Sequence, residues 1–147
     1  MSPPQEYVPM SKTSVVTAMS VAAPYAVTLE DHAGHHWLGD EPIESGGGNK
    51  GPTPHQLLLS SLGACTAITL RMYAARKGWS LNGVEVELEF NPDGAPAAGG
   101  HEIRRRITLR GDLTPGERER LLDIANRCPI HKVLTGEVRI ASSLGPA

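Results

Sequence analysis

The sequence predicts an α+β fold built as a single domain. One long apolar segment, residues 57–72, lies between a helix start signal and a helix stop signal. Two later segments, residues 84–90 and 103–109, alternate between apolar and charged side chains as half-buried strands do. With 147 residues, 39% of them hydrophobic, the chain is long enough to bury a core. We expect a flexible arm over residues 1–13 and one domain over residues 14–147.

The composition argues against several classes of function. A formal net charge of −2 gives no electrostatic basis for binding nucleic acid or an anionic membrane. No run of about 18 apolar residues and no secretory signal is present, so we expect a cytoplasmic protein without a membrane partner. Two cysteines are too few for a disulfide-stapled secreted scaffold, and on composition alone they could be buried, inert thiols.

Three strands are expected in the N-terminal part, over residues 15–21, 25–29 and 35–38, with Pro24 between the first two. The loop over residues 45–50 contains three successive glycines. Gly46, Gly48 and Gly51 match the spacing G-x-G-x-x-G, but no βαβ unit surrounds them and no Gly-Lys-Ser/Thr follows. A phosphate-binding loop is therefore not expected.

The strongest structural signal is a helix from Pro54 to about Lys77. Thr53 and Gln56 fit a capping box, and Gly78 is a suitable stop. Its interior is apolar almost all round, so we expect it to be buried on every side. Small residues in its middle, such as Gly63, would let another segment approach closely.

An antiparallel hairpin and two shorter elements follow. In the hairpin, the three glutamates of residues 84–90 would lie near the arginines of residues 103–110. A second capping box, Thr114 with Glu117, opens a helix to about Arg127, whose apolar face ends at Cys128. A short helical turn over residues 129–134 and a last strand over residues 138–141 complete the expected elements.

Cys128 is the first candidate for chemistry. It directly precedes Pro129, a residue favoured in the first position of a helix, and so would be the N-cap. Unpaired backbone N–H groups there stabilise a thiolate, and Arg127 and His131 could add positive potential. A purely structural cysteine at a helix junction is the alternative.

Cys65 lies in the middle of the apolar helix, where burial alone would raise its pKa. Ser61 and Thr69 are its polar neighbours on the same stripe, and a cleft at a dimer interface is one way to make it accessible. His55, ten residues earlier, is about 15 Å away along the axis and cannot touch Cys65 within one straight helix. We expect it to be a helix-start residue, and an active-site role is the alternative. Zinc ligands could come from Cys65, Cys128, His131 and His55, but only Cys128-x-x-His131 has ligand-like spacing, and no metal is expected.

The segment over residues 51–66, GPTPHQLLLSSLGACT, together with Arg127-Cys128-Pro129, resembles the OsmC/Ohr family of osmotically inducible and organic hydroperoxide resistance proteins. Order and spacing are similar over roughly residues 15–142, and residues 72–79 suggest a generic OsmC-like branch. The resemblance implies an OsmC-like fold. Long central helices would pack between antiparallel β-sheets in an intertwined homodimer, with two active sites at the subunit interface.

The resemblance also implies a thiol-dependent peroxidase that acts on organic hydroperoxides or hydrogen peroxide in oxidative-stress defence. Cys65 would become a sulfenic acid, Cys128 would condense with it to a disulfide, and a dithiol reductant would restore both thiols. No metal or organic cofactor is implied. The alternatives are a non-catalytic protein that binds an apolar ligand at the dimer interface, and a redox sensor.

The sequence departs from the family pattern in the cation that activates the first thiol. Family members pair an arginine of an early strand with a glutamate near the start of the helix, whereas here His55 stands at the glutamate position and no arginine precedes Arg71. The replacement could be Arg127, an arginine of the central sheet, or His55 of the partner subunit.

Overall fold

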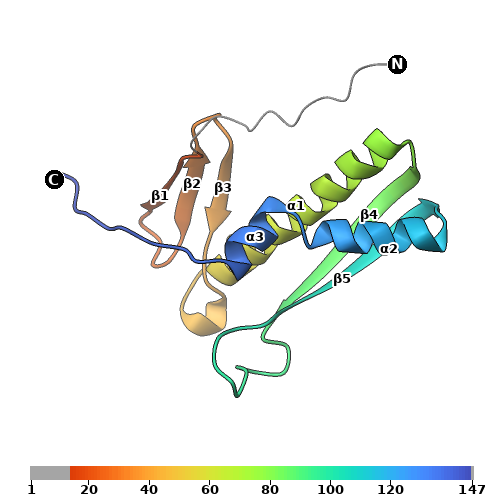
Figure 1. The fold of residues 1–147 in the computed structure, drawn as a ribbon. Helices are drawn as coiled ribbons and strands as arrows, with labels where there is room; N and C mark the ends of the chain where they lie inside the picture. Colours follow the sequence, from red (N-terminus) through yellow and green to blue (C-terminus); the bar gives the residue numbers. More distant parts are fainter. Residues whose placement is uncertain (1–13, 147) are drawn as a thin grey trace. The chain divides into compact units, whose positions relative to one another are not determined.

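The computed structural model describes residues 14–146, and the arm expected over residues 1–13 lies outside them. The fold is α+β (Figure 1). The chain divides into two compact units, with the boundary between Ser60 and Ser61 inside the long helix α1, Pro54–Lys77.

The first unit contains a three-stranded antiparallel sheet. Its strands are β1 (Val16–Ser20), β2 (Val27–Asp31) and β3 (His36–Gly39), in the order β1-β2-β3. The three strands expected from the sequence are thus confirmed, with shifts of one or two residues at their ends.

The glycine-rich loop after β3 is organised by the buried carboxylate of Asp40. A short 3-10 helix, η1 (Ile43–Ser45), precedes it. Asp40 accepts hydrogen bonds from the backbone N–H groups of Glu41, Gly48 and Lys50, at 2.7, 3.2 and 3.1 Å. These bonds lower the pKa of Asp40 below its usual value, and the bond from Lys50 has the largest effect. A carboxylate of the chain itself therefore binds N–H groups that a phosphate loop would offer to its ligand.

Helix α1 begins and ends where the sequence predicts. Thr53 and Gln56 form both bonds of a capping box, with Thr53 Oγ1 accepting from Gln56 N at 3.2 Å and Gln56 Oε1 accepting from Thr53 N at 2.9 Å. Gly78 follows the helix in the left-handed region, at φ +71°, which glycine adopts without steric cost.

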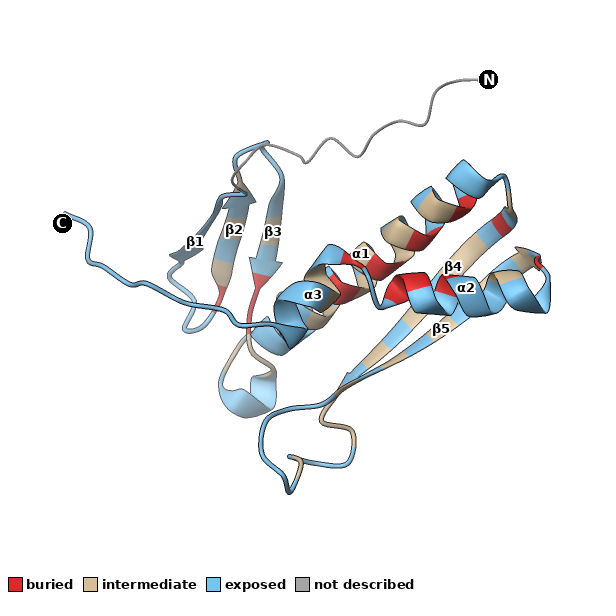
Figure 2. Ribbon diagram, viewed as in Figure 1, coloured by how far each residue is buried: buried red, intermediate tan, exposed pale blue. Residues whose placement is uncertain are grey.

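Burial of α1 follows one stripe (Figure 2). The buried residues recur every four positions: Leu62, Thr66, Leu70 and Ala74. Ile68 and Met72, on other faces, are 57% and 45% exposed. The expectation that the helix is buried on every side is therefore wrong for the single chain, because the remaining apolar faces are left to solvent.

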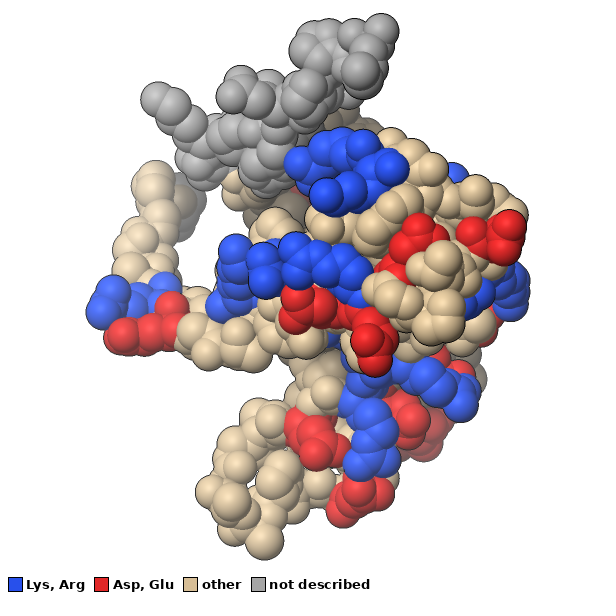
Figure 3. Space-filling model, turned by 45° about the vertical axis from the view of Figure 1, so that its right-hand side comes forward, with Lys and Arg blue, Asp and Glu red and all other residues tan. Residues whose placement is uncertain are grey.

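The second unit contains the long hairpin of β4 (Ser80–Phe90) and β5 (Ile103–Asp112). Two of the expected charge pairs form on its outer face, Arg106 with Glu87 and Arg110 with Glu85, each at 2.9 Å. Arg104 instead binds acidic residues of the connecting loop, Asp93 and Glu102. Basic and acidic side chains are accordingly interspersed on the face seen in Figure 3.

Helix α2 (Pro115–Ala125) covers the hairpin and is followed by α3 (Pro129–Thr135). The Thr114–Glu117 capping box is present, and α2 ends two residues before the expected Arg127. Side chains of α1, α2 and the hairpin region form one core: Leu70, Ala74, Leu81, Leu113, Leu121, Ile124 and Ala125. Gly63 of α1 lies against β4, where an added Cβ would come within 2.9 Å of Leu88 Cδ1.

The last strand expected, over residues 138–141, is wrong. No strand is assigned after α3, and Val138 and Ile140 are 59% and 87% exposed. A β-branched segment forms a strand only where a neighbouring strand supplies hydrogen bonds, and within residues 14–146 this segment has no such partner.

Candidate thiol site

Two sulfur atoms are brought together by the middle of α1 and the first turn of α3. Cys65 Sγ accepts a hydrogen bond from the backbone N–H of Ile130 at 3.5 Å. Cys128 Sγ accepts from the backbone N–H of His131 at 3.3 Å. The Cys128 thiol is also close enough to Cys65 to raise its pKa. The pair is thus held in place mainly by backbone groups.

Local chain geometry explains the position of Cys128. The residue is extended, at φ −66° and ψ 144°, and Pro129 follows it as the first residue of α3. The predicted N-cap is therefore confirmed, with the sulfur accepting the bond that a cap side chain normally accepts. Cys128 is fully buried, on the same apolar face of the α2 region as Leu121 and Ala125.

The surroundings of Cys65 keep it a neutral thiol. Burial raises the pKa of Cys65, and the adjoining Cys128 thiol raises it further. The N–H of Ile130 and the hydroxyl of Thr69 act in the opposite direction, and the net pKa lies above the usual value. Both free cysteines are thiols in this structure.

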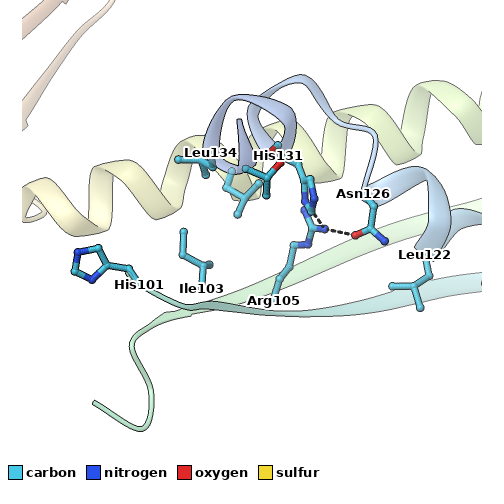
Figure 4. A pocket seen from close by; sticks show the side chains of 9 residues that line it. His101, Ile103, Arg105, Leu122, Asn126, His131 and Leu134 are labelled. Carbon is cyan, nitrogen blue, oxygen red and sulfur yellow. Dashed lines mark hydrogen bonds between the residues drawn. The ribbon is translucent and has the colours of Figure 1, made fainter. Parts of the chain in front are cut away.

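A half-buried arginine on β5 joins the elements around the thiols. Arg105 Nη1 donates to Thr66 Oγ1 at 3.0 Å. Its Nη2 donates to Asn126 Oδ1 at 3.0 Å and to His131 Nδ1 at 3.2 Å (Figure 4). Thr66 directly follows Cys65 and is fully buried. Arg105 therefore links β5 to α1, to the end of α2 and to α3.

His131 is held as a neutral imidazole. Burial and then the charge of Arg105 lower its pKa below the usual value. Since Nδ1 accepts from Arg105, we assign the ring proton to Nε2. The positive potential expected from this residue is thus opposed by its surroundings, and its role at the thiols stays a prediction.

Beside this network lies a pocket of about 390 Å³. Its apolar wall consists of Leu62, Ile103, Leu122 and Leu134, and its polar wall of His101, Arg105, Asn126, His131 and Thr135. Figure 4 shows Arg105 reaching from β5 toward His131 and Asn126 between these walls. A pocket with apolar walls and a few polar groups suits an organic molecule with one charged or polar end.

The other residues singled out from the sequence lie as follows. Ser61 is exposed on α1, one turn before Cys65, and His55 is exposed in the first turn of the helix. Arg127 is exposed and approaches Asp123 at 3.5 Å. The structure thus brings together Cys65, Cys128 and His131. In the part of the chain that is described, no group of three or more His, Cys, Asp or Glu is arranged to hold a metal ion.

Arg105 is a site residue that the sequence indicated only as one of several arginines of the central sheet. The signal was present, because Arg105 shares the apolar face of its strand with Ile103, Ile107 and Leu109. A lone charge on such a face requires buried polar partners, and here they are Thr66, Asn126 and His131. Which residues those would be depends on tertiary packing.

A family model described as OsmC-like protein matches residues 47–143. The chain belongs to the OsmC family. The resemblance to the OsmC/Ohr proteins is therefore confirmed, and the matched region includes both thiols and Arg105. A search of curated proteins finds no match.

Solved structures share the OsmC fold with this chain. The OsmC-like protein of Mycoplasma pneumoniae is 23% identical, with a TM-score of 0.70 over 86% of this chain and 90% of that one. An organic hydroperoxide resistance protein OsmC of Legionella pneumophila is 22% identical, with a TM-score of 0.62 over 86% and 92%. The organic hydroperoxide resistance protein OhrB of Bacillus subtilis is 22% identical, with a TM-score of 0.54 over 84% and 91%. At these identities the likeness establishes the fold.

Helix α1 of this OsmC-like protein is also long and apolar enough to span a membrane by length and composition. The core helix of a soluble protein meets the same criteria. Length and composition alone are therefore weak evidence for a membrane span.

Proposed function

We propose that this OsmC-like protein is a cysteine-based peroxidase that reduces organic hydroperoxides or hydrogen peroxide in oxidative-stress defence. The observation that carries the proposal is the pairing of Cys65 with Cys128 at the start of α3. Two neighbouring thiols can store and release the two electrons that reduction of a peroxide requires.

In the first step, the Cys65 thiolate attacks one oxygen of the peroxide. The O–O bond breaks, and the other oxygen takes up a proton and leaves as an alcohol, or as water when the substrate is hydrogen peroxide. Cys65 becomes a sulfenic acid. The N–H of Ile130, which hydrogen-bonds Cys65 Sγ, would stabilise the thiolate. In the second step, the Cys128 thiolate attacks the sulfenic sulfur, a disulfide forms and water leaves. A dithiol then reduces the disulfide and restores both thiols.

The names of structural neighbours support this class of activity, since those from Legionella pneumophila and Bacillus subtilis are organic hydroperoxide resistance proteins. The apolar wall of the pocket beside Arg105 suits an organic substrate. We further propose that the protein is cytoplasmic and forms a homodimer. The dimer is supported by the exposed apolar side chains of α1, such as Ile68 and Met72, which offer a surface for a second copy.

The test is intact-mass analysis of the reduced protein after one equivalent of cumene hydroperoxide, with and without a thiol-alkylating reagent. We expect a rapid loss of about 2 Da and two thiols that no longer alkylate, as disulfide formation requires. Cys65→Ser should abolish peroxide consumption. Unchanged mass with two reactive thiols, or full activity of Cys65→Ser, would refute the proposal.

The raised pKa of Cys65 favours a second candidate, a redox sensor that forms the same disulfide with negligible turnover. Steady-state peroxide consumption with excess dithiothreitol separates the two. Many turnovers per protein identify the peroxidase, whereas one oxidation event per protein identifies the sensor.

A further inference from the structure

Arg105 is a cation without a counter-ion. Its three side-chain hydrogen bonds all go to neutral acceptors, Thr66 Oγ1, Asn126 Oδ1 and His131 Nδ1. No acidic side chain pairs with it in the described part of the chain, although the flanking Arg104 and Arg106 both bind carboxylates. Partial removal of a charge from water costs free energy unless the charge is paired. A bound anion would therefore stabilise Arg105.

The guanidinium of Arg105 also has N–H donors that the chain does not use. The three bonds use one Nη1–H and both Nη2–H groups, and the Nε–H and the second Nη1–H have no protein acceptor among residues 14–146. His131, which accepts through Nδ1, keeps its Nε2–H as a further donor at the same pocket. Donors of this kind form strong, charge-assisted bonds with a carboxylate.

The rest of the pocket selects what the anion is attached to. Ile103, Leu122 and Leu134 line the same pocket as the guanidinium (Figure 4), and Leu62 completes its apolar wall. A small inorganic anion would leave this wall unused, whereas an aliphatic chain would cover it.

We propose that this pocket binds an aliphatic carboxylate, with the carboxylate at Arg105 and His131 and the chain along the apolar wall. In the peroxidase cycle, which rests on the proposed function, Arg105 would then favour organic hydroperoxides that carry a carboxylate over neutral ones. Arg105 acts here as a specificity-determining residue.

The binding test uses octanoate and octanamide, two probes of equal chain length that cannot oxidise a thiol, titrated into the reduced full-length protein by calorimetry. We expect octanoate to bind at least about tenfold more tightly than octanamide, as charge-assisted hydrogen bonds provide. Arg105→Gln should remove this difference. Arg106→Gln is the matched control, because Arg106 lies on the outer face of the same strand and pairs with Glu87.

Equal binding of the two probes by the natural protein, or an unchanged preference in Arg105→Gln, would overturn the proposal and leave Arg105 as a structural link. If Arg105→Gln fails to fold, the comparison of the two probes on the natural protein still decides, with Arg105→Lys as a second variant. We expect Arg105→Lys to bind octanoate with intermediate affinity, because lysine cannot form the paired contacts of a guanidinium.

The kinetic test compares a hydroperoxide that carries a carboxylate with its methyl ester. Arg105→Gln should lower kcat/KM for the acid at least about tenfold more than for the ester, while Arg106→Gln should leave the acid-to-ester ratio unchanged. Binding of octanoate through Arg105 without any peroxide consumption would refute the peroxidase and keep the ligand. Peroxide consumption with no acid preference and no octanoate binding would refute the carboxylate pocket and keep the peroxidase.

Discussion

At the scale of single residues, the protonation of Cys65 sets how the site reacts. Its pKa lies above the usual value because the sulfur is removed from water and faces a second thiol. Since only the thiolate is nucleophilic, most Cys65 is in the unreactive form at neutral pH. The hydrogen bonds of Arg105 go to Thr66, Asn126 and His131, and Arg105 is not among the groups with the largest effects on the pKa of Cys65.

We predict that alkylation of Cys65 by iodoacetamide accelerates with pH and is still accelerating above about 8.5, the ordinary pKa of a thiol. The sign follows from the raised pKa: below it the neutral thiol dominates, and the thiolate fraction grows until pH exceeds it. The measurement is a stopped-flow rate profile. A plateau below pH 8 would show a thiolate-stabilised cysteine instead.

Cys128→Ser should separate the two thiol roles. Without the neighbouring thiol, we expect one oxidation event per protein and then conversion of Cys65 to sulfinic acid as peroxide increases. Mass spectrometry would show additions of oxygen in place of the loss of about 2 Da expected for the disulfide. Normal turnover of this variant with a dithiol would remove Cys128 from the mechanism; Cys65→Ser, treated in the same way, is the unreactive control.

At the scale of elements, helix ends hold the site in place. The capping box of Thr114 and Glu117 fixes the start of α2, whose far end leads to Asn126 and Cys128. We predict that Thr114→Ala lowers the free energy of unfolding by about 1 kcal/mol, the usual worth of an N-cap side chain.

Urea denaturation measures this loss, with Glu119→Ala as control. Glu119 is exposed on the same helix, and no hydrogen bond or ion pair of its side chain is found in the described part of the chain. Equal stability of Thr114→Ala and the natural protein would show that α2 is fixed by its packing through Leu121 and Ile124 alone.

The elements were predictable wherever their signals are local. Thr53 with Gln56, Thr114 with Glu117, and Cys128 before Pro129 each define a helix start within a few residues, and all three are confirmed. The strand expected over residues 138–141 failed, because a strand also depends on a partner that local sequence does not specify. The same limit applies to Arg105: its strand was predictable, and its contacts with α1 and α3 depend on tertiary packing.

At the scale of the whole molecule, the unburied faces of α1 bear on assembly. Only the stripe that includes Leu62 and Leu70 is buried in the chain, so side chains such as Ile68 and Met72 would be exposed in a monomer. Exposed apolar surface of this extent on a central helix is typical of a subunit interface.

We predict a dimer of about twice the 15.7 kDa chain mass in sedimentation equilibrium. Ile68→Glu should shift the equilibrium toward the monomer, because it places a charge in the apolar contact. Ala98→Glu, in the exposed loop between β4 and β5, is the matched control and should leave the dimer intact. A monomeric natural protein would contradict the proposed homodimer.

The bonds to the two sulfurs have a consequence for how such a site can diversify. Cys65 and Cys128 are held by the backbone N–H groups of Ile130 and His131, which every residue except proline supplies. The side chain of His131 meanwhile lines the pocket beside Arg105. The main chain thus holds the two sulfur atoms, while the side chains of the same residues can vary and so change which molecule the pocket binds. We therefore expect that a substitution of His131 by a residue other than proline changes the pocket and leaves the two sulfurs in place.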